Sequence, residues 1–386
     1  MDELGFAAPT SSVRSAMDWR VDPLIALTDL GRLDLDVIRR HVLSNTVYSV
    51  AGLTLPQEAW WSDMAAHRPD RELSRARKVG RSDVDSVQEI VATFSRIDQR
   101  RGGGHGRRAL VEYLRTDVAG FLSGHFSNAQ VRRDMFSAAA ELAYLSGWMA
   151  FDNQQHAIAQ HYFTLSVKLA ATADNPPLVG HILRAMAHQA VDLGHHQQAL
   201  HLATASMNDK RYNLATPRER ALLGVIYARS LAATGQKHAA AQALLKAEDD
   251  LTAATPDIKE PSRTFFFAEA SLAHETACTL RDSGDPKGAV REFRRSVKTR
   301  KASSFRRTHA VTLGYLASVQ ASQGSLEEAC STWSRALDAM EDGVYSGRAR
   351  DTVVNMRRLL SPYRPRGVPF ISELDARAAA YLSRVD

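Results

Sequence analysis

A short segment in the first third of the chain has the composition of a phosphate-binding loop. Residues 100–108, RRGGGHGRR, place four glycines between four arginines, and both glycine backbone amides and arginine side chains bind phosphate. Such loops follow a strand, however, and occur with Lys-Ser/Thr or with an acid about 20 residues on. Here a helical pattern precedes the glycines and no Lys-Ser/Thr follows. We therefore interpret them as a tight turn between two helices, with Arg107 opening the second helix.

Other residue types that support catalysis are present without the spacing that catalysis needs. The 14 histidines are scattered, and the sequence contains neither HExxH, nor GxSxG, nor paired histidines with an acid at metal-ligand spacing. The 2 cysteines, Cys278 and Cys330, both lie in helical patterns, so their number excludes a disulfide framework or a cysteine-rich metal site. We expect no enzymatic activity, no metal and no cofactor.

A basic run offers a possible surface for an anionic partner. The chain has a net charge of +6, and residues 291–307 contain one acid, Glu292. The basic residues of this patch are Arg291, Arg294, Arg295, Lys298, Arg300 and Lys301, followed by Arg306 and Arg307. A solvated helix face that runs into a loop gives the same pattern. Binding of nucleic acid or of an acidic partner through this run is therefore the weaker interpretation.

Helical repeats form the chain from about residue 135 onward. A turn glycine followed five residues later by alanine recurs, and one further copy has Gln154 in place of the glycine. The alanines of these copies are Ala159, Ala199, Ala240, Ala289 and Ala329. Small residues let the two helices of a hairpin approach closely, and glycine permits a left-handed turn between them. We predict an all-α fold, a solenoid in which each helical hairpin stacks on the next.

The small, turn, alanine and aromatic positions of the copies resemble those of tetratricopeptide repeats. The alanines are 40, 41, 49 and 40 residues apart, longer than the usual period of about 34, and the longest gap holds a proline-bearing loop at 251–264. The resemblance implies a right-handed superhelix of helical hairpins. We predict four segments. These are a connector and linker with short helices over 1–81, an N-terminal helical hairpin over 82–134, about five repeats over 135–340 and capping helices over 341–386.

A longer set of motifs resembles one family of regulators. These motifs are FSRIDQRRGGGHG, AAELAYLSGWMAFD, the following Tyr-Phe pair, RDSGDPKGAV and RRLLSPY. Over residues 80–386 they are similar to the C-terminal region of actinobacterial helix-turn-helix (XRE-type) transcription regulators. The resemblance implies a regulatory domain for dimerisation and for sensing a ligand or partner protein. The opening MDELGF resembles the connector that follows the DNA-binding head in such regulators, so we expect that head to be absent. Residues 24–47 contain a short turn between helical stretches, which is too little for a three-helix DNA-binding domain.

The tetratricopeptide resemblance also implies a binding groove, since the first helix of each hairpin lines the concave face. The repeat register predicts these groove residues: Tyr144, Trp148, Asp152, His181, Arg184, His188, Arg229, His274 and Arg281. Arginine binds a carboxylate through two parallel hydrogen bonds, and aromatic rings add apolar contact. In the alternative interpretation Trp148 belongs to the hairpin core. Arg184 and Arg229 then lie on a solvated concave surface or form an internal salt bridge with Asp192 or Asp152.

Two classes of function follow from these patterns. The chain is either the sensor and dimerisation body of a transcription regulator, which binds a peptide, small ligand or partner protein, or a stand-alone protein-interaction adaptor without a ligand switch. In either case, we expect the chain to act on DNA only through a missing domain or through a partner. We expect a homodimer, for which Trp60 and Trp61 offer an interface. No apolar run approaches 18 residues and no leader pattern is present, which predicts a cytoplasmic protein without membrane contact.

Overall fold

The computed structural model describes residues 17–36, 48–66, 77–366 and 368–385. The connector-like opening of the chain, much of segment 24–47 and most of the predicted linker lie outside these residues. Regular structure in the described part is helical, apart from one pair of two-residue parallel strands, β1 (Lys78–Val79) and β2 (His125–Phe126). The predicted all-α class is confirmed.

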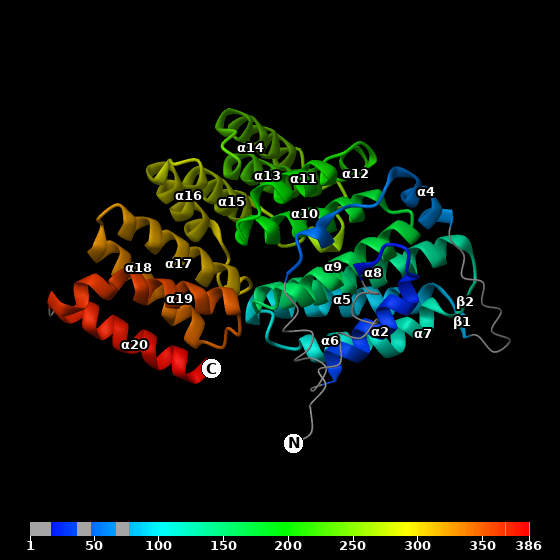
Figure 1. Cartoon of the computed structure of the whole chain (residues 1–386), viewed down its shortest axis with the longest axis horizontal. Coiled ribbons are helices and arrows are strands. Elements are labelled where there is room, and N and C mark those ends of the chain that lie inside the picture. Colours follow the sequence, from blue (N-terminus) through cyan, green and yellow to red (C-terminus); the bar gives the residue numbers. More distant parts are fainter. Residues whose placement is uncertain (1–16, 37–47, 67–76, 367, 386) are drawn as a thin grey trace, which may run out of the picture.

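Helical hairpins stacked in chain order form an arc (Figure 1). The first helices of the hairpins are α8 (Ala129–Asp152), α10 (Pro176–Asp192), α13 (Pro217–Ala233), α15 (Glu269–Asp282) and α17 (Arg306–Ser322). Their second helices are α9 (His156–Thr172), α11 (His196–Ser206), α14 (Lys237–Thr252), α16 (Pro286–Thr299) and α18 (Leu326–Glu341). A last pair, α19 (Gly347–Leu360) and α20 (Pro369–Val385), packs on α17 and α18. The predicted solenoid is confirmed, whereas its assignment to tetratricopeptide repeats and its hand stay predictions.

The turn within each of the five repeat hairpins lies at the residue that the repeat predicts. Left-handed backbone occurs at Gly194 (φ 79°), Gly235 (φ 83°), Gly284 (φ 84°), Gly324 (φ 83°) and, in the copy without glycine, Gln154 (φ 67°). Glycine adopts this conformation without a steric cost. The predicted close approach of paired helices is also present, because a Cβ on Gly147 of α8 would lie 2.9 Å from the ring of Phe163 on α9.

The N-terminal helices cover the start of the arc. Helix α5 (Arg81–Arg101) packs along α8, and α2 (Pro23–Leu35) and α4 (Glu58–Ala66) pack on α9. Helix α6 (Arg107–Tyr113) continues through a π-helical turn, Leu114–Val118, into α7 (Ala119–Leu122). The remaining short elements are η1 (Ala51–Leu53), α12 (Lys210–Asn213), η3 (Ser262–Thr264) and η4 (Ser361–Arg366). One hydrophobic core joins the N-terminal helices to the first three hairpins, and a second occupies α17–α20.

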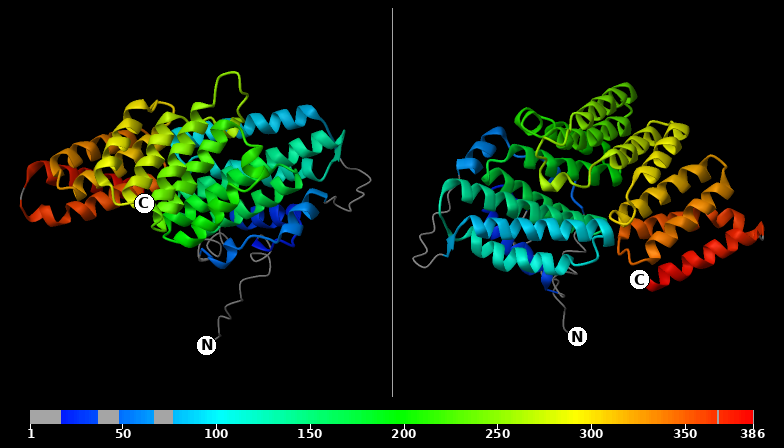
Figure 2. Two further views of the ribbon diagram at one scale, coloured as in Figure 1. Left: turned by 90° about the horizontal axis from the view of Figure 1, so that it is seen from above. Right: turned by 180° about the vertical axis from the view of Figure 1, so that it is seen from behind.

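The glycine-rich segment joins two regions that are far apart in the sequence. It forms the turn between α5 and α6, as predicted, and Gly104 N–H donates to the Tyr345 carbonyl at 2.9 Å. A Cβ on Gly102 would lie 2.4 Å from that carbonyl oxygen, and one on Gly103 would lie 2.3 Å from the Met149 carbonyl oxygen. Only glycine permits such close backbone approach. The cluster therefore serves packing between the turn, α8 and the segment before α19, and α5 also contacts α17 (Figure 2).

Candidate functional site

The predicted groove residues converge inside the solenoid, but nearly all of them are buried. All except Arg281 are at most 8% exposed. The segment between α14 and α15, residues 253–268, covers many of them, and we call it the groove segment. Its residue Phe267 is 1% exposed, and Phe265 and Phe266 lie with Tyr144 and Trp148 around a small cavity of about 30 Å³. The chain itself therefore fills much of the predicted concave groove.

Ion pairs fix the groove segment to the first helices of two hairpins. Arg263 binds both carboxylate oxygens of Glu219 on α13, at 2.7 and 2.8 Å, and contacts Glu141 on α8 at 3.2 Å. Burial raises the pKa of Glu219, but the charge of Arg263 and the hydrogen bond from His181 outweigh it and lower the pKa to about 2. The groove segment is thus held by a largely buried bidentate pair.

His181 and Arg184 belong to the same buried network. Burial lowers the pKa of His181 to about 4, so its ring is neutral at pH 7. The Nδ1 atom lies 3.1 Å from a Glu219 oxygen, and Nε2 lies 3.2 Å from Arg184 Nη2. Because Glu219 is a carboxylate and Arg184 only donates, the ring donates through Nδ1 and accepts through Nε2. Arg184 also donates to the Tyr144 hydroxyl at 3.0 Å. These predicted groove residues are internal hydrogen-bonding groups.

Asp152 is likewise bound by groups of the chain itself. It accepts from Gly103 N–H at 2.9 Å and from Arg307 Nη1 at 3.1 Å. Arg307 also donates to Asp98 of α5 at 3.2 Å. The pKa of Asp98 is raised to about 6, because burial outweighs the attraction of Arg307. Asp152 therefore pairs with Arg307, which is not one of the arginines considered for it above. The internal salt bridge that was left open is instead the Arg229–Asp192 pair, at 2.7 Å.

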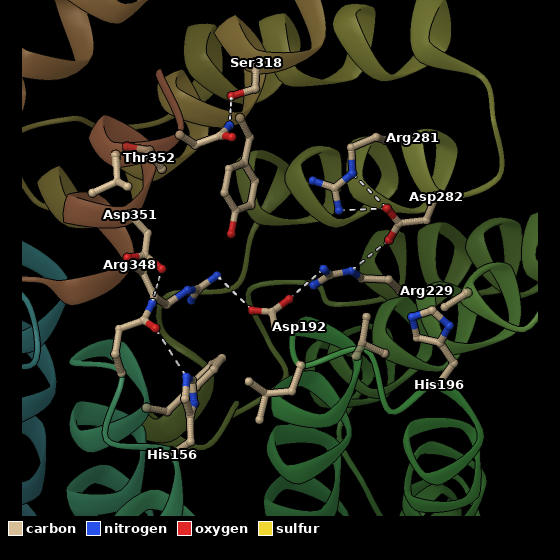
Figure 3. A pocket seen from close by; sticks show the side chains of 18 of the residues that line it. His156, Asp192, His196, Arg229, Arg281, Asp282, Ser318, Arg348, Asp351 and Thr352 are labelled. Carbon is tan, nitrogen blue, oxygen red and sulfur yellow. Dashed lines mark hydrogen bonds and ion pairs between the residues drawn. The ribbon is translucent and has the colours of Figure 1, made fainter. Parts of the chain in front are cut away.

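An open pocket of about 740 Å³ lies at the C-terminal ends of α8, α10, α13 and α15, opposite α17 and α19. We call it the polar pocket (Figure 3). Its polar and charged lining residues are Gln154, His156, Asp192, His196, Arg229, Arg281, Asp282, Tyr315, Ser318, Arg348, Asp351, Thr352, Asn355 and Arg358. Its volume falls within the range of about 300–1,000 Å³ that is usual for small-molecule sites.

A chain of ion pairs crosses the wall of the polar pocket (Figure 3). Asp192 on α10 lies 3.7 Å from Arg348 of α19 and 2.7 Å from Arg229 of α13. Arg229 continues to Asp282 at 3.4 Å, and Asp282 pairs with Arg281 at 2.8 Å. Burial raises the pKa of Asp192, yet the charge of Arg229 and the contact with His188 hold it well below its ordinary value. Four helices are thereby connected through side-chain charge.

Arginines outnumber acids around this pocket, and two of them keep donors available. The lining arginines are Arg229, Arg281, Arg348 and Arg358, against Asp192, Asp282 and Asp351. Arg358 is exposed and donates to the neutral Asn355 side chain at 2.8 Å. Arg281 is partly exposed and its guanidinium lies 5.5 Å from the centre of the Tyr315 ring. The arrangement favours a carboxylate or another anion.

The sequence prediction and the polar pocket overlap in Arg229 and Arg281. The sequence analysis did not predict the α19 residues that line the polar pocket, because it interpreted their segment as a cap. A signal was present, since Arg348, Asp351, Thr352 and Asn355 follow the spacing of one helix face in an otherwise mixed segment. His188 and His274 lie deeper than this pocket, with His274 Nδ1 3.0 Å from the Thr312 hydroxyl.

The predicted basic patch is not a continuous free surface. Arg300 is 8% exposed and donates to the Ala270 carbonyl. Arg294 pairs with Glu328, and Arg295 pairs with Glu269 at 3.2 Å. The patch residues that the structure leaves exposed are Arg291, Arg294, Lys298 and Lys301. Charge pairing therefore reduces the anion-binding capacity that the sequence run indicates.

Comparisons with known proteins leave the polar pocket as the main guide to function. No protein-family model matches the chain, and no curated protein matches it. Within the described ranges, no helix has the length and apolar character to cross a bilayer. Among the same residues, no group of three or more histidine, cysteine or acidic side chains is placed to hold a metal ion.

Proposed function

We propose that this chain is a regulatory α-solenoid that binds a small anionic ligand, such as an organic acid or the C-terminus of a short peptide, in the polar pocket. The observation that supports this most is the open 740 Å³ pocket whose lining arginines outnumber its acids. The carboxylate of the ligand contacts Arg281 and Arg358, and Asn355 and Ser318 offer neutral hydrogen-bonding groups. No chemical conversion of the ligand is part of the proposal.

The position of the polar pocket supports a sensing role. Its walls come from the five repeat hairpins and from α19, so a bound ligand contacts elements that are otherwise joined by the Asp192–Arg348 pair at 3.7 Å. A ligand that binds one arrangement of these elements better than another shifts the population towards it. In line with the family resemblance, we propose that a DNA-binding domain or partner in the cytoplasm reads this shift and that the chain acts as a dimer.

The alternative of a stand-alone adaptor receives less support. Such an adaptor would hold a partner peptide in the concave groove, where the groove segment of this chain lies against α8 and α13. A partner peptide there would have to displace the bidentate Arg263–Glu219 pair. The adaptor therefore remains the second interpretation.

Thermal unfolding of the purified chain with a panel of small carboxylic acids and short peptides tests the proposal. A ligand that binds only the folded state raises the unfolding temperature in a saturable way. We expect Arg358→Gln to weaken that ligand about 10-fold or more, since a hydrogen bond to a charged group contributes about 1.5–3 kcal/mol. Arg291→Gln, which removes an exposed arginine outside the pocket, serves as the matched control. The proposal is wrong if no member of the panel stabilises the wild type, or if Arg358→Gln binds as well as the control.

A further inference from the structure

A second, smaller cavity lies deeper in the solenoid. Its volume is about 60 Å³, and α5, α8, α10, α13, α15, α17, α19 and the groove segment contribute to its walls. We call it the inner cavity. Apolar groups from Trp148, Phe266 and Phe267 line part of it. The remaining wall carries four arginines, which are Arg184, Arg300, Arg307 and Arg348. It shares Arg348 with the polar pocket and is otherwise lined by different charged residues.

Two of these arginines have carboxylate partners outside the cavity. Arg307 pairs with Asp98 at 3.2 Å and with Asp152 at 3.1 Å. Arg348 lies 3.7 Å from Asp192. Their charges are therefore compensated by acids that face them from α5, α8 and α10.

Arg184 and Arg300 differ from these two because their hydrogen-bond partners are neutral. Arg184 is 2% exposed, and its donors reach the Tyr144 hydroxyl and the His181 ring. Arg300 is 8% exposed and donates to the Ala270 carbonyl at 2.9 Å and to the Ser296 hydroxyl at 3.1 Å. Among the described residues neither guanidinium forms an ion pair with a carboxylate. Both charges are thus buried without a counter-charge in contact.

Unused donors accompany this charge. The Nε atoms of Arg184, Arg300 and Arg348 are buried and have no hydrogen-bond partner within the part of the chain that the structure describes. An arginine side chain stays protonated in proteins, so it cannot relieve burial by losing its charge. A buried charge or donor without a partner is costly. Among the described residues, no carboxylate therefore accepts a hydrogen bond from Arg184 or Arg300.

The acid that lines the inner cavity, Glu275, is not a hydrogen-bond or ion-pair partner of Arg184 or Arg300. Glu275 lies 3.9 Å from Arg229 and has a buried oxygen without a hydrogen-bond partner. Burial, together with the charge of Arg307, lowers the pKa of Arg300 to about 10, against the weaker attraction of Glu275. His188 and His274 also line the cavity, and burial lowers the pKa of both rings, so neither adds a positive charge at pH 7.

We propose that the inner cavity is a binding site for one compact anion, held by the guanidinium groups of Arg184 and Arg300. A cavity needs a volume of about 10–15 Å³ to hold a single water molecule. The 60 Å³ of the inner cavity therefore accommodates a halide, phosphate, sulfate or the carboxylate of a very small acid. Nucleotides and peptides are too large. The anion neutralises the inner face and connects α10 to the end of α16, independently of any ligand in the polar pocket.

Anion titrations of the dialysed full chain test this site. The protein is kept in HEPES, whose anion is too large for the cavity, and ionic strength is held constant with the same buffer. Sodium phosphate, sulfate, chloride and acetate are added separately while the unfolding temperature and the binding heat are recorded. We expect one of these anions to bind saturably with one site per chain. The preferred anion shows whether the natural occupant is an inorganic ion or a carboxylate.

Variants assign the binding to the inner cavity. Arg300→Gln and Arg184→Gln are each expected to weaken the preferred anion by about 10-fold or more. Arg281→Gln, which alters the polar pocket alone, should leave this affinity unchanged. A response that is the same in Arg300→Gln and in the wild type overturns the proposal, as does the absence of saturable binding.

A crystallographic readout keeps the proposal open to refutation if the variants do not fold. Crystals of the wild type soaked in bromide should show an anomalous peak within hydrogen-bonding distance of Arg184 or Arg300. A cavity that holds only water overturns the proposal. Because the panel of acids and Arg358→Gln probe the polar pocket, a failure there leaves this result intact, and the converse also holds.

Discussion

Arg263 offers the sharpest test of the buried architecture. The variant Arg263→Met removes the cation that lies between Glu219 and Glu141 and preserves much of the side-chain volume. Glu219 has a side chain that is 1% exposed and Arg263 one that is 11% exposed, so little solvent screens the pair. Removing one partner of a buried ion pair costs about 3–5 kcal/mol, because the remaining charge is left uncompensated.

The pKa of Glu219 gives an independent magnitude. The change from 4.5 to about 2 corresponds to about 3 kcal/mol of stabilisation of the carboxylate form. Because the folded-state pKa is depressed, this stabilisation is present above the unfolded value of 4.5 and is lost as the pH falls towards 2. The variant loses the depressed pKa. Its deficit relative to the wild type should therefore be about 1 kcal/mol smaller at pH 4 than at pH 7.

Urea unfolding at pH 7 and pH 4, followed by tryptophan fluorescence and far-ultraviolet circular dichroism, measures both quantities. Trp148 lies beside the groove segment, so an early fluorescence change with retained helicity would report release of that segment. Arg263→Lys keeps the positive charge without the bidentate geometry, so its free energy of unfolding should fall less than that of Arg263→Met. Arg291→Met is the control for removing an exposed arginine. A loss below about 1 kcal/mol for Arg263→Met, or one equal to the control, would refute the reasoning.

Two further predictions concern the glycine turn and a buried histidine. Gly103→Ala places a Cβ 2.3 Å from the Met149 carbonyl oxygen and should lower the free energy of unfolding by about 1–3 kcal/mol, measured by urea unfolding. The control Gly120→Ala, whose Cβ would have no atom within 4 Å, should be neutral or slightly stabilising. Equal effects of the two variants would contradict the packing role of Gly103. Burial lowers the pKa of His161 from 6.5 to about 4, so stability falls as the pH drops below 6.5, and His161→Gln should remove about 2 kcal/mol of the wild-type loss between pH 6.5 and 5. The exposed His238→Gln is the control, and an unchanged pH profile in His161→Gln would count against the burial argument.

The sequence identified the repeating parts of the fold for local reasons. A turn between two helices depends on a few adjacent residues, so the position of Gly235 or Gly324 predicts its left-handed backbone. The repeat register, taken from the tetratricopeptide resemblance, placed Tyr144, His181 and Arg229 on the concave face of the solenoid. Both properties follow from the backbone period and from single-residue conformational preference.

The accessible site depended on contacts that periodicity does not record. Arg263 reaches Glu141 across 122 residues of sequence, and this pairing places the groove segment over residues that were expected to be open. The polar pocket requires α19 to lie opposite Asp192, which the fold and not the helix pattern determines. Sequence reasoning therefore predicted an open groove at residues that the structure shows to be mostly buried.

The contacts between α5 and α17 change how the molecule must fold. In an open repeat array each unit contacts only its neighbours, folding starts anywhere and terminal units fray independently. Here Arg307 bonds to Asp98 across 209 residues, which raises the contact order and requires a long loop to close before these bonds form. Folding is then slower than that of an open array, and α5 and α17 share one unfolding transition. Deleting α19 and α20 would consequently loosen the glycine turn, which bonds to Tyr345 just before α19, and with it α5. These elements would unfold at a lower urea concentration than the central hairpins, although they lie far from α19 in the sequence.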